Sequence, residues 1–409
     1  MERTKWQQLS LSASKVFTPA VPINAETLFA GRIEQVRRVV DAVNQPGQHA
    51  MIFGERGVGK TSLANIISTK ITGPVLPIRV NCDSTDTYSS LWRKVFERIS
   101  FQQTSPGMGL GGNSTMTSNV LADQLEDEVV PGHVCRLLER LTGVLLILVI
   151  DEFDTVPDKN VKQAMADTIK TLSDNAIAAT VVLVGVADSV DDLIEQHHSI
   201  ERALVQIQMP RMSTAEVHEI IDNGLQELGM AIDVEAKKEV ALISKGLPHY
   251  THLLSRHAVR AAVDRESMTV GLEDVETAIS KSLNDAQETI RSAYHGATMS
   301  TRRDTIFPQV LLACALAKTD ELGYFAAGDV RSPLSDIMGK TYRIASFSRH
   351  LNDFCGGERG PVLEKTGTAY RYRFRFITPL MQPYVIMQGR AKGLIQQKAD
   401  GNDQRLTFG

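Results

Sequence analysis

One glycine-rich run constrains the fold of this chain more than any other feature. Residues 54–61 read GERGVGKT, a full match to the pattern G-x-x-x-x-G-K-[ST]. The short apolar segment 51–53 precedes the run, and a helical pattern follows from Ser62. A strand, a glycine loop and a helix in this order place backbone N–H groups around an anion. The run therefore predicts a P-loop at the carboxyl end of a strand in an α/β domain.

The residue types of the predicted P-loop point to the triphosphate of a nucleotide. Lys60 can reach the β- and γ-phosphates, and the hydroxyl of Thr61 can ligate Mg²⁺. The helix that follows adds the positive end of its dipole. The residues expected around the phosphates are three glycines and the three residues after the last of them: Gly54, Gly57, Gly59, Lys60, Thr61 and Ser62. We expect ATP and Mg²⁺ as ligands.

A second segment, about ninety residues further along, supplies two acids. Residues 145–150 form a continuous aliphatic run, which is typical of a parallel strand buried on both faces, and Asp151 and Glu152 follow it directly. Ligands bind at the carboxyl ends of such strands. We expect Asp151 to hold Mg²⁺, directly or through water, and Glu152 to polarise the attacking water as general base. A P-loop chain with both acids is predicted to hydrolyse ATP.

The order of the predicted elements indicates a doubly wound parallel α/β domain followed by helices. Strand and helix patterns alternate up to residue 208, and helical patterns follow without a strand signal from residue 214. The expected divisions are an irregular N-terminal segment, a P-loop ATPase domain, a helical lid, a linker, a C-terminal domain and a tail: residues 1–23, 24–210, 211–285, 286–301, 302–395 and 396–409.

The stretch 102–119 interrupts the predicted α/β domain. It is rich in Gly, Ser, Thr and Met, and it has no hydrophobic period. Long loops of this kind inside a compact domain are functional or disordered. We expect residues 103–119 to form either an adaptable surface that orders on a protein partner or a tolerated insertion.

The C-terminal segment predicts a winged helix-turn-helix. Three helical patterns, at 306–316, 327–338 and 346–355, precede a hairpin pattern at 362–365 and 369–376. The last strand alternates strictly between aromatic residues and arginines, so its arginines share one face. In a winged helix-turn-helix the third helix enters the major groove of DNA, and the hairpin reaches the backbone or the minor groove.

The distribution of charge agrees with a nucleic-acid contact at this end. From residue 301 onward the chain carries 16 Lys and Arg against 10 Asp and Glu, whereas the first 300 residues carry 28 against 38. The expected DNA-facing set is Arg349, His350, Arg359 and Lys365. Winged helices also serve as protein-docking modules, and this alternative stays open.

In this order the features resemble the AAA+ ATPases of the initiator-like group, above all the archaeal origin-recognition ATPases and their bacterial relatives. Residues 28–32 (LFAGR) resemble the F-x-G-R box of that group, which implies that Arg32 lies at the adenine end of ATP. Residues 54–61 and 149–152 match its Walker A and Walker B motifs. Residues 184–189 (VGVADS) fall where the group carries its sensor-1 strand, with Asp188 or Ser189 in the place of the usual Asn.

The resemblance also implies two nucleotide-sensing residues outside the Walker motifs. Arg202, in the segment SIER before the last strand, stands where the family places the arginine finger that completes a neighbouring subunit's site. That role implies a homo-oligomer. Residues 246–250 (GLPHY) resemble the lid motif, with His249 where many relatives carry a sensor-2 arginine. The same motif also looks like the lid of STAND-type signalling ATPases.

Several classes of site and protein find no support. The four cysteines are scattered without a C-x-x-C pair, which indicates neither a zinc site nor a disulfide framework. The N-terminus lacks the apolar stretch of a signal peptide, and the longest apolar run, 144–150, is too short to span a bilayer. We expect a cytoplasmic protein that does not contact a membrane.

The sequence therefore predicts an ATP-controlled switch that assembles with ATP and binds duplex DNA through its C-terminal module. The alternative is a STAND-like signalling ATPase whose C-terminal module docks a protein partner, in a defence or mobile-element system. A motor that threads a polymer is disfavoured, because residues 81–87 (NCDSTDT) lack an aromatic–hydrophobic pore-loop pair.

Overall fold

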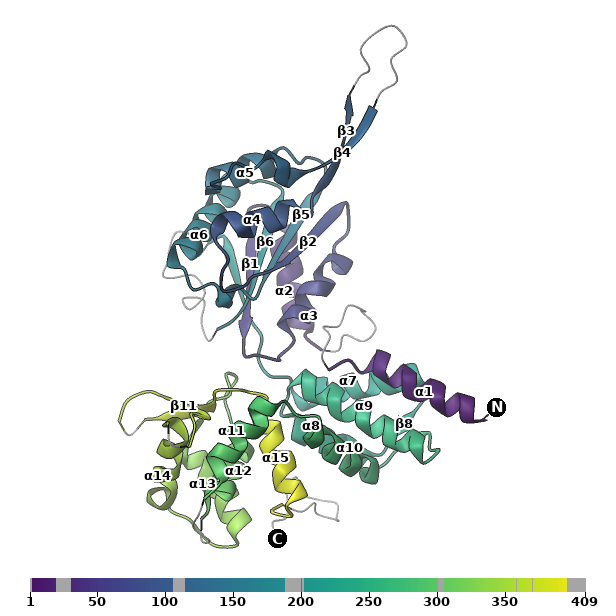
Figure 1. Cartoon of the computed structure of the whole chain (residues 1–409), viewed down its shortest axis with the longest axis vertical. Coiled ribbons are helices and arrows are strands. Elements are labelled where there is room, and N and C mark those ends of the chain that lie inside the picture. The colour runs from purple at the N-terminus through teal and green to yellow at the C-terminus, as the bar shows by residue number, and fades with distance from the viewer. Residues whose placement is uncertain are drawn as a thin grey trace.

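The computed structural model describes residues 2–19, 31–105, 115–187, 200, 202–300, 305–357, 359–369 and 371–395. A sheet domain occupies one end of the molecule, and two largely helical groups lie side by side at the other (Figure 1). In the part of the chain so described, no helix is long and apolar enough to cross a membrane.

The sheet domain is built on five parallel strands in the order β2-β5-β6-β1-β7. The strands are β1 (His49–Gly54), β2 (Val75–Asn81), β5 (Leu145–Asp151), β6 (Ala179–Val186) and β7 (Leu204–Gln208). The three central strands are buried almost throughout, as their aliphatic runs require. The predicted parallel α/β sheet is confirmed.

Helices cover both faces of this sheet, so the domain is doubly wound. One face packs against α2 (Ile33–Asn44) and α3 (Lys60–Ile66), through a core that includes Val39, Leu63, Ile52 and Val184. The other face packs against α4 (Tyr88–Phe96), α5 (Pro131–Glu139) and α6 (Lys159–Asp174). Short 3₁₀ turns connect these elements: η2 (Ile67–Lys70), η3 (Leu121–Gln124) and η4 (Phe153–Thr155).

A two-stranded ribbon projects from the sheet domain away from the rest of the molecule (Figure 1). Its strands are β3 (Ser100–Ser105) and β4 (Thr115–Val120), paired antiparallel over six residue pairs from Ser100↔Val120 to Ser105↔Thr115. The expectation of an irregular loop over 103–119 is wrong for these two strands, and residues 106–114 lie outside the described residues.

The N-terminal segment also differs from the expectation of irregular structure. Residues Glu2–Val16 form helix α1, which lies along the lid (Figure 1). The ring of Phe17, just beyond α1, lies 5.9 Å from that of His252 and so close to Gly224 that a Cβ there would meet it at 2.3 Å. This apolar contact spans more than 200 residues of chain and leaves no local periodic signal.

The lid is the helical group formed by α7 (Thr214–Leu228), α8 (Val234–Ser244), α9 (Pro248–Asp264) and α10 (Leu272–Asn284). Ser213 begins α7 with a capping box, because its side chain accepts from the backbone of Glu216 while the Glu216 carboxylate accepts from Ser213. Two short strands, β8 (Ala231–Ile232) and β9 (Thr269–Val270), pair in parallel within the lid, where the sequence predicts helices alone.

The C-terminal module is the second helical group, and it contains a small sheet. Its elements in chain order are α11 (Glu288–Thr298), α12 (Phe307–Leu316), β10 (Phe325–Ala326), α13 (Ala327–Met338), α14 (Ile344–Cys355), β11 (Leu363–Thr366), β12 (Arg373–Phe376) and α15 (Met381–Ala391). Strand β12 pairs antiparallel with both β10 and β11.

The details of the C-terminal module differ from the sequence pattern in three ways. The predicted linker at 286–301 contains helix α11, with Ile290 and Tyr294 buried. Helix α15 follows the hairpin without having been predicted, and it packs against α12 and the lid. The predicted last strand shortens to Arg373–Phe376, where Phe374 and Phe376 are buried and Arg373 and Arg375 form ion pairs with Asp320 and Glu364.

Candidate functional site

The glycine-rich run lies where β1 ends at the carboxyl edge of the sheet, between β6 and β7. Gly54, Gly57 and Gly59 have φ angles of 147°, 88° and 97°, which side-chain-bearing residues rarely adopt. A Cβ at Gly54 would also lie 2.5 Å from the carbonyl oxygen of Met209. Helix α3 begins directly after the glycines at Lys60. The backbone here has the P-loop path that the pattern predicts.

Lys60 is buried in the P-loop and held by the loop's own carbonyl groups. Its Nζ donates to the carbonyl oxygens of Gly54 at 3.0 Å and Glu55 at 2.8 Å. Burial lowers the pKa of Lys60 to about 8, against the opposing influence of nearby acids, of which Asp154 is the largest contributor. These carbonyl contacts can be exchanged for phosphate oxygens, which are better partners for an ammonium group.

Thr61 and Asp151 meet across the sheet edge. The Thr61 hydroxyl donates to Oδ2 of Asp151 at 2.9 Å, and the other carboxylate oxygen accepts from the Glu152 backbone N–H at 2.9 Å. Neighbouring ligands of an octahedral Mg²⁺ lie about 2.9 Å apart, given metal–oxygen distances of 2.0–2.1 Å. The hydroxyl and carboxylate oxygens therefore fit a Mg²⁺ ion.

Glu152 follows Asp151 in an uncommon backbone conformation. Its φ is 58° and its ψ is 33°, a left-handed geometry that costs a residue other than glycine on the order of 1 kcal/mol. The residue is exposed, whereas its neighbours Asp151 and Phe153 are buried. The turn therefore leaves the Glu152 carboxylate accessible to water at the strand end, where an acid–base role requires it.

Two residues at this edge escaped the sequence interpretation. Arg79 lies on the neighbouring strand β2, and its Nη2 is 2.8 Å from Oδ2 of Asp151. Asp154 accepts from the backbone N–H of Val186 at 2.8 Å and so links η4 to the end of β6. A charged residue near the end of an apolar strand was the available signal for Arg79, but its partner depends on which strands are neighbours.

The comparisons with known proteins agree with this geometry. Residues 43–194 match the family model of the AAA domain. This chain contains an AAA domain. No curated protein matches the sequence significantly.

The fold similarity extends beyond the AAA domain. The structure of the ORC2 protein of Aeropyrum pernix in ADPNP–ADP complexes superposes with a TM-score of 0.50 at 14% identity, covering 92% of this chain and 98% of that one. The Walker-type ATPase PABY2304 of Pyrococcus abyssi superposes with a TM-score of 0.51 at 14% identity, covering 90% and 99%. The predicted resemblance to archaeal origin-recognition ATPases is confirmed at the level of the fold.

Arg32 connects the AAA domain to the lid. It is buried with a φ of 60°, its backbone N–H donates to the Glu216 carboxylate at 3.0 Å, and its guanidinium donates to the carbonyl oxygen of Val58 at 3.2 Å. Burial lowers the pKa of Arg32 from its ordinary value. The contact with Val58 places Arg32 beside the P-loop; residues 28–30 of its motif lie outside the described residues.

His249 lies at the first turn of lid helix α9, beside the P-loop. A Cβ on Gly59 would lie 3.9 Å from Pro248, the residue before His249. Nδ1 of His249 makes a 2.7 Å hydrogen bond with the carbonyl oxygen of Pro19, and burial lowers the pKa of its imidazole. The predicted sensor-1 positions Asp188 and Ser189 lie outside the described residues.

Arg202 lies at the opposite edge of the AAA domain from the P-loop. It precedes β7, whose first residue Leu204 pairs with His49 at the amino end of β1, and its carbonyl accepts from the Gln48 side chain at 3.1 Å. The residue is exposed. The whole length of β1 therefore separates Arg202 from the P-loop of its own chain.

The four predicted DNA-facing residues have different surroundings. Arg349 on α14 has a side chain 91% exposed, with Asp353 3.9 Å away. Arg359 donates to the carbonyl oxygens of Ala297 and Met299 and lies 3.6 Å above the Phe307 ring.

The other two also contact the module itself. The ring of His350 lies 4.6 Å from that of Phe307, and burial lowers the pKa of this histidine. Lys365 donates to the Asn352 side chain at 3.0 Å and lies over the Tyr372 ring. Of the predicted set, Arg349 and Lys365 are exposed, and His350 and Arg359 are partly buried.

Proposed function

We propose that this protein is an ATP-hydrolysing switch whose nucleotide state controls the C-terminal module and, through it, the binding of duplex DNA. The observation that carries the ATPase part is the convergence of Lys60, Thr61, Asp151 and Glu152 at one edge of the sheet. The fold relatives are described as a Walker-type ATPase and as a protein in ADPNP–ADP complexes, which is the ligand class that this P-loop suits.

The residues present support a specific division of the chemical work. Lys60 exchanges the carbonyls of Gly54 and Glu55 for phosphate oxygens and stabilises their charge. Thr61 and Asp151 hold Mg²⁺, which when bound neutralises charge on the phosphates. Glu152 accepts hydrogen bonds from the attacking water and takes up its proton.

A buried polar chain supports coupling between the P-loop and the C-terminal module. The carboxylate of Glu55, the second residue of the P-loop, pairs with Nε of Arg211 at 2.8 Å, and both side chains are at least nine-tenths buried. Arg211 also hydrogen-bonds to Gln382 on α15. Removing one partner of a buried ion pair destabilises the protein, because the other charge is left buried without a partner. A displacement of Glu55 by nucleotide would therefore also displace Arg211 and, through Gln382, α15.

Close backbone approaches reinforce this coupling. Gly323, in the loop before β10, lies so close to Glu55 that a Cβ there would meet its carboxylate at 2.0 Å. The carbonyl oxygen of Leu380, at the start of α15, accepts from the Tyr250 hydroxyl of the lid at 2.8 Å. The AAA domain, the lid and the C-terminal module therefore meet around the P-loop.

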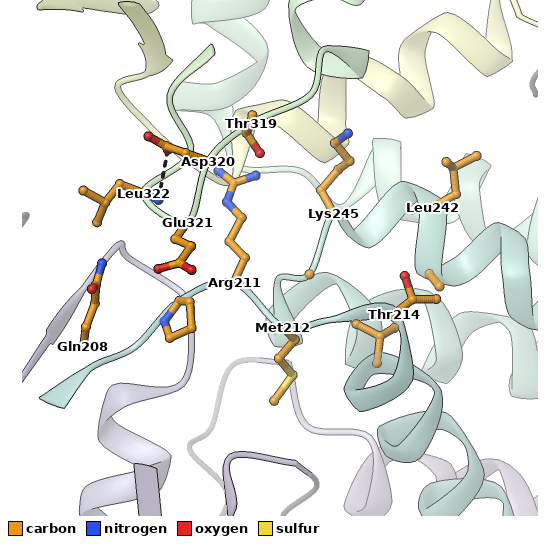
Figure 2. Close-up of a pocket in the computed structure, with 14 residues that line it drawn as sticks. Gln208, Arg211, Met212, Thr214, Leu242, Lys245, Thr319, Asp320, Glu321 and Leu322 are labelled. Carbon is orange, nitrogen blue, oxygen red and sulfur yellow. Dashed lines mark hydrogen bonds between the residues drawn. The ribbon is translucent and has the colours of Figure 1, made fainter. Parts of the chain in front are cut away.

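A cavity beside these contacts leaves room for movement. It has a volume of about 800 Å³ and lies between the connector that follows β7, the lid helices α7 and α8, and residues 319–322 of the C-terminal module. Figure 2 shows Arg211 extending from the connector between that loop and Lys245. We propose that the C-terminal module shifts against the lid here when the nucleotide changes.

The C-terminal module supports the DNA-binding part of the proposal. Three helices α12, α13 and α14 precede the antiparallel pair β11–β12, which is the element order of a winged helix. Around the first turns of α14, Lys340, Arg343 and Arg349 are all exposed. We propose that these three cations contact phosphates of a duplex, and that Arg349 is the member of the original set that contributes most.

A second function keeps one specific observation in its favour. Arg359 and Lys365 are engaged within the module, and His350 packs against Phe307. Arg359 and Lys365 are therefore less suited to contacting DNA, which favours docking to a protein partner, as the STAND-like alternative proposes. The ribbon β3–β4 would offer such a partner an additional surface.

The position of Arg202 bears on assembly. A residue at the amino edge of the sheet is far from its own P-loop, so a role in catalysis requires a second copy of the chain. We propose that Arg202 reaches the γ-phosphate bound by a neighbouring subunit in a homo-oligomer.

The test of the proposed function combines nucleotide and DNA binding. Binding of a fluorescent ATP analogue and release of phosphate are measured first, and duplex binding is then followed by fluorescence anisotropy with ATP, with ADP and without nucleotide. We expect nucleotide binding, slow hydrolysis and tighter duplex binding with ATP, through the avidity of an assembled oligomer. Duplex binding that is absent at low salt in all three states would favour the protein-docking alternative.

A further inference from the structure

The carboxylate of Asp151 has more partners than its role as a metal ligand requires. Oδ1 accepts from the Glu152 backbone, and Oδ2 accepts from both Thr61 at 2.9 Å and the guanidinium of Arg79 at 2.8 Å. The Asp151 side chain is 3% exposed. Oδ2 faces Thr61 and therefore the expected metal position, and it is already paired with the guanidinium of Arg79.

Arg79 is held in this position from a second side. Its Nη1 donates to Oδ1 of Asn65 at 2.7 Å, and Asn65 lies on α3, one turn after Thr61. The guanidinium thus bridges α3 and the end of β5, while the Arg79 side chain remains 32% exposed. Since β2 is the edge strand of the sheet, solvent has access to this side of the bridge.

We propose that Arg79 is a positioning residue that occupies Asp151 in the metal-free state and has to release it before Mg²⁺ binds with nucleotide. This inference rests on the proposed ATPase function. The guanidinium neutralises the buried carboxylate and occupies the oxygen that faces Thr61, so it competes with Mg²⁺ for Asp151. Asn65 remains as the second partner, so a released Arg79 stays tethered next to the site.

The exchange makes metal binding dependent on breaking an ion pair. While Arg79 is bound, Asp151 attracts Mg²⁺ less, because the net charge of the pair is close to zero. Thr61 is left as the other protein ligand, and its hydroxyl is neutral. Arg79 therefore raises the Mg²⁺ concentration that nucleotide binding requires, and removing Arg79 lowers it. If the ion pair only held Asp151 in place, removing Arg79 would raise that concentration instead.

The experiment measures metal dependence directly and does not rely on turnover. A fluorescent ADP analogue is titrated into wild type, Arg79→Gln and Asn65→Ala across a series of Mg²⁺ concentrations, and thermal unfolding without Mg²⁺ reports stability. We expect the Mg²⁺ concentration for half-maximal binding to fall about fivefold in Arg79→Gln, as for the loss of a partly exposed ion pair, and less in Asn65→Ala.

A matched control is Arg265→Gln in the lid. Arg265 pairs with Asp274 at 2.7 Å, and that carboxylate is also buried, but the pair lies away from the P-loop. This variant should lose stability without changing the Mg²⁺ requirement. An unchanged or higher requirement in a folded Arg79→Gln protein would overturn the inference and leave the ATPase proposal standing. Wild type that binds no nucleotide at saturating Mg²⁺ would overturn both.

Discussion

At the carboxyl edge of the sheet, the spacing of residues in the sequence predicts which side chains meet. On the surface of the C-terminal module, the same kind of pattern predicts side-chain contacts much less well. At the sheet edge, Lys60, Thr61 and Asp151 lie within a web of contacts of 2.8–3.0 Å. On the C-terminal module, the four candidate DNA-facing side chains chosen by pattern divide between solvent and internal contacts. Buried, glycine-dependent geometry leaves few choices, whereas an exposed arginine takes whichever partner the tertiary structure brings near.

The largest expected effect is at the P-loop, whose side chains the glycine-rich pattern predicts. Lys60→Ala should abolish turnover and weaken ATP binding by about a hundredfold or more, because the β- and γ-phosphates lose their main side-chain partner. Fluorescent nucleotide binding measures the loss. Lys238→Ala, which removes an exposed lysine paired with Glu235 in the lid, is the matched control and should behave as wild type. Near-normal affinity in Lys60→Ala would break the comparison.

Glu152→Gln separates binding from chemistry in the same region. An amide keeps the size of the side chain but cannot take up a proton, so turnover should fall by about 10² to 10⁴ while ATP affinity stays within a few-fold of wild type. Phosphate release under single-turnover conditions is the measurement. Hydrolysis at the wild-type rate would remove Glu152 from the role of base.

Arg202 tests whether a residue far from its own P-loop completes a neighbour's site. Arg202→Ala should bind ATP and hydrolyse it at least about tenfold more slowly. Mixing it with Lys60→Ala chains should restore part of the activity, since one chain then supplies the P-loop and the other the arginine. Mixed oligomers are verified by mass before the assay. No recovery at any mixing ratio would count against the trans role.

The smallest effect sharpens the comparison on the C-terminal module itself. Arg349→Ala should reduce the slope of log affinity against log salt for a DNA duplex by about one, because one phosphate contact is lost. Arg359→Ala should leave that slope unchanged and lower stability instead, by about 1 kcal/mol, because its guanidinium binds carbonyls of α11 and the Phe307 ring.

Fluorescence anisotropy across a salt series and thermal unfolding distinguish the roles of Arg349 and Arg359. An equal change of slope in both variants would show that Arg359 leaves its internal contacts to meet DNA. An effect on neither slope, with the complex of a protein partner weakened by Arg349→Ala, would favour the docking alternative.

Much of the AAA domain was predictable from contiguous residues. The P-loop, the buried strand that ends in Asp151 and the alternation of strands with helices all have short-range signals, and the sheet confirms them. The C-terminal module was predicted less completely. Helix α11 forms where the sequence predicted a linker, and helix α15 forms where it predicted no element. The apolar residues of α15 are buried against α12 and the lid, which are distant in the chain, and Tyr294 of α11 packs against Tyr384 of α15.

Local sequence determined where backbone N–H groups could gather around an anion, because three glycines with positive φ and a following lysine and threonine are adjacent in the chain. Only the tertiary structure decided which other side chains contact the residues of that site. Arg79 reaches Asp151 from 72 residues away, and Arg211 joins Glu55 to Gln382 across 156 and 171 residues. Such pairs depend on strand order and domain packing, which are set by the burial of apolar surface, so no spacing along the chain can specify them.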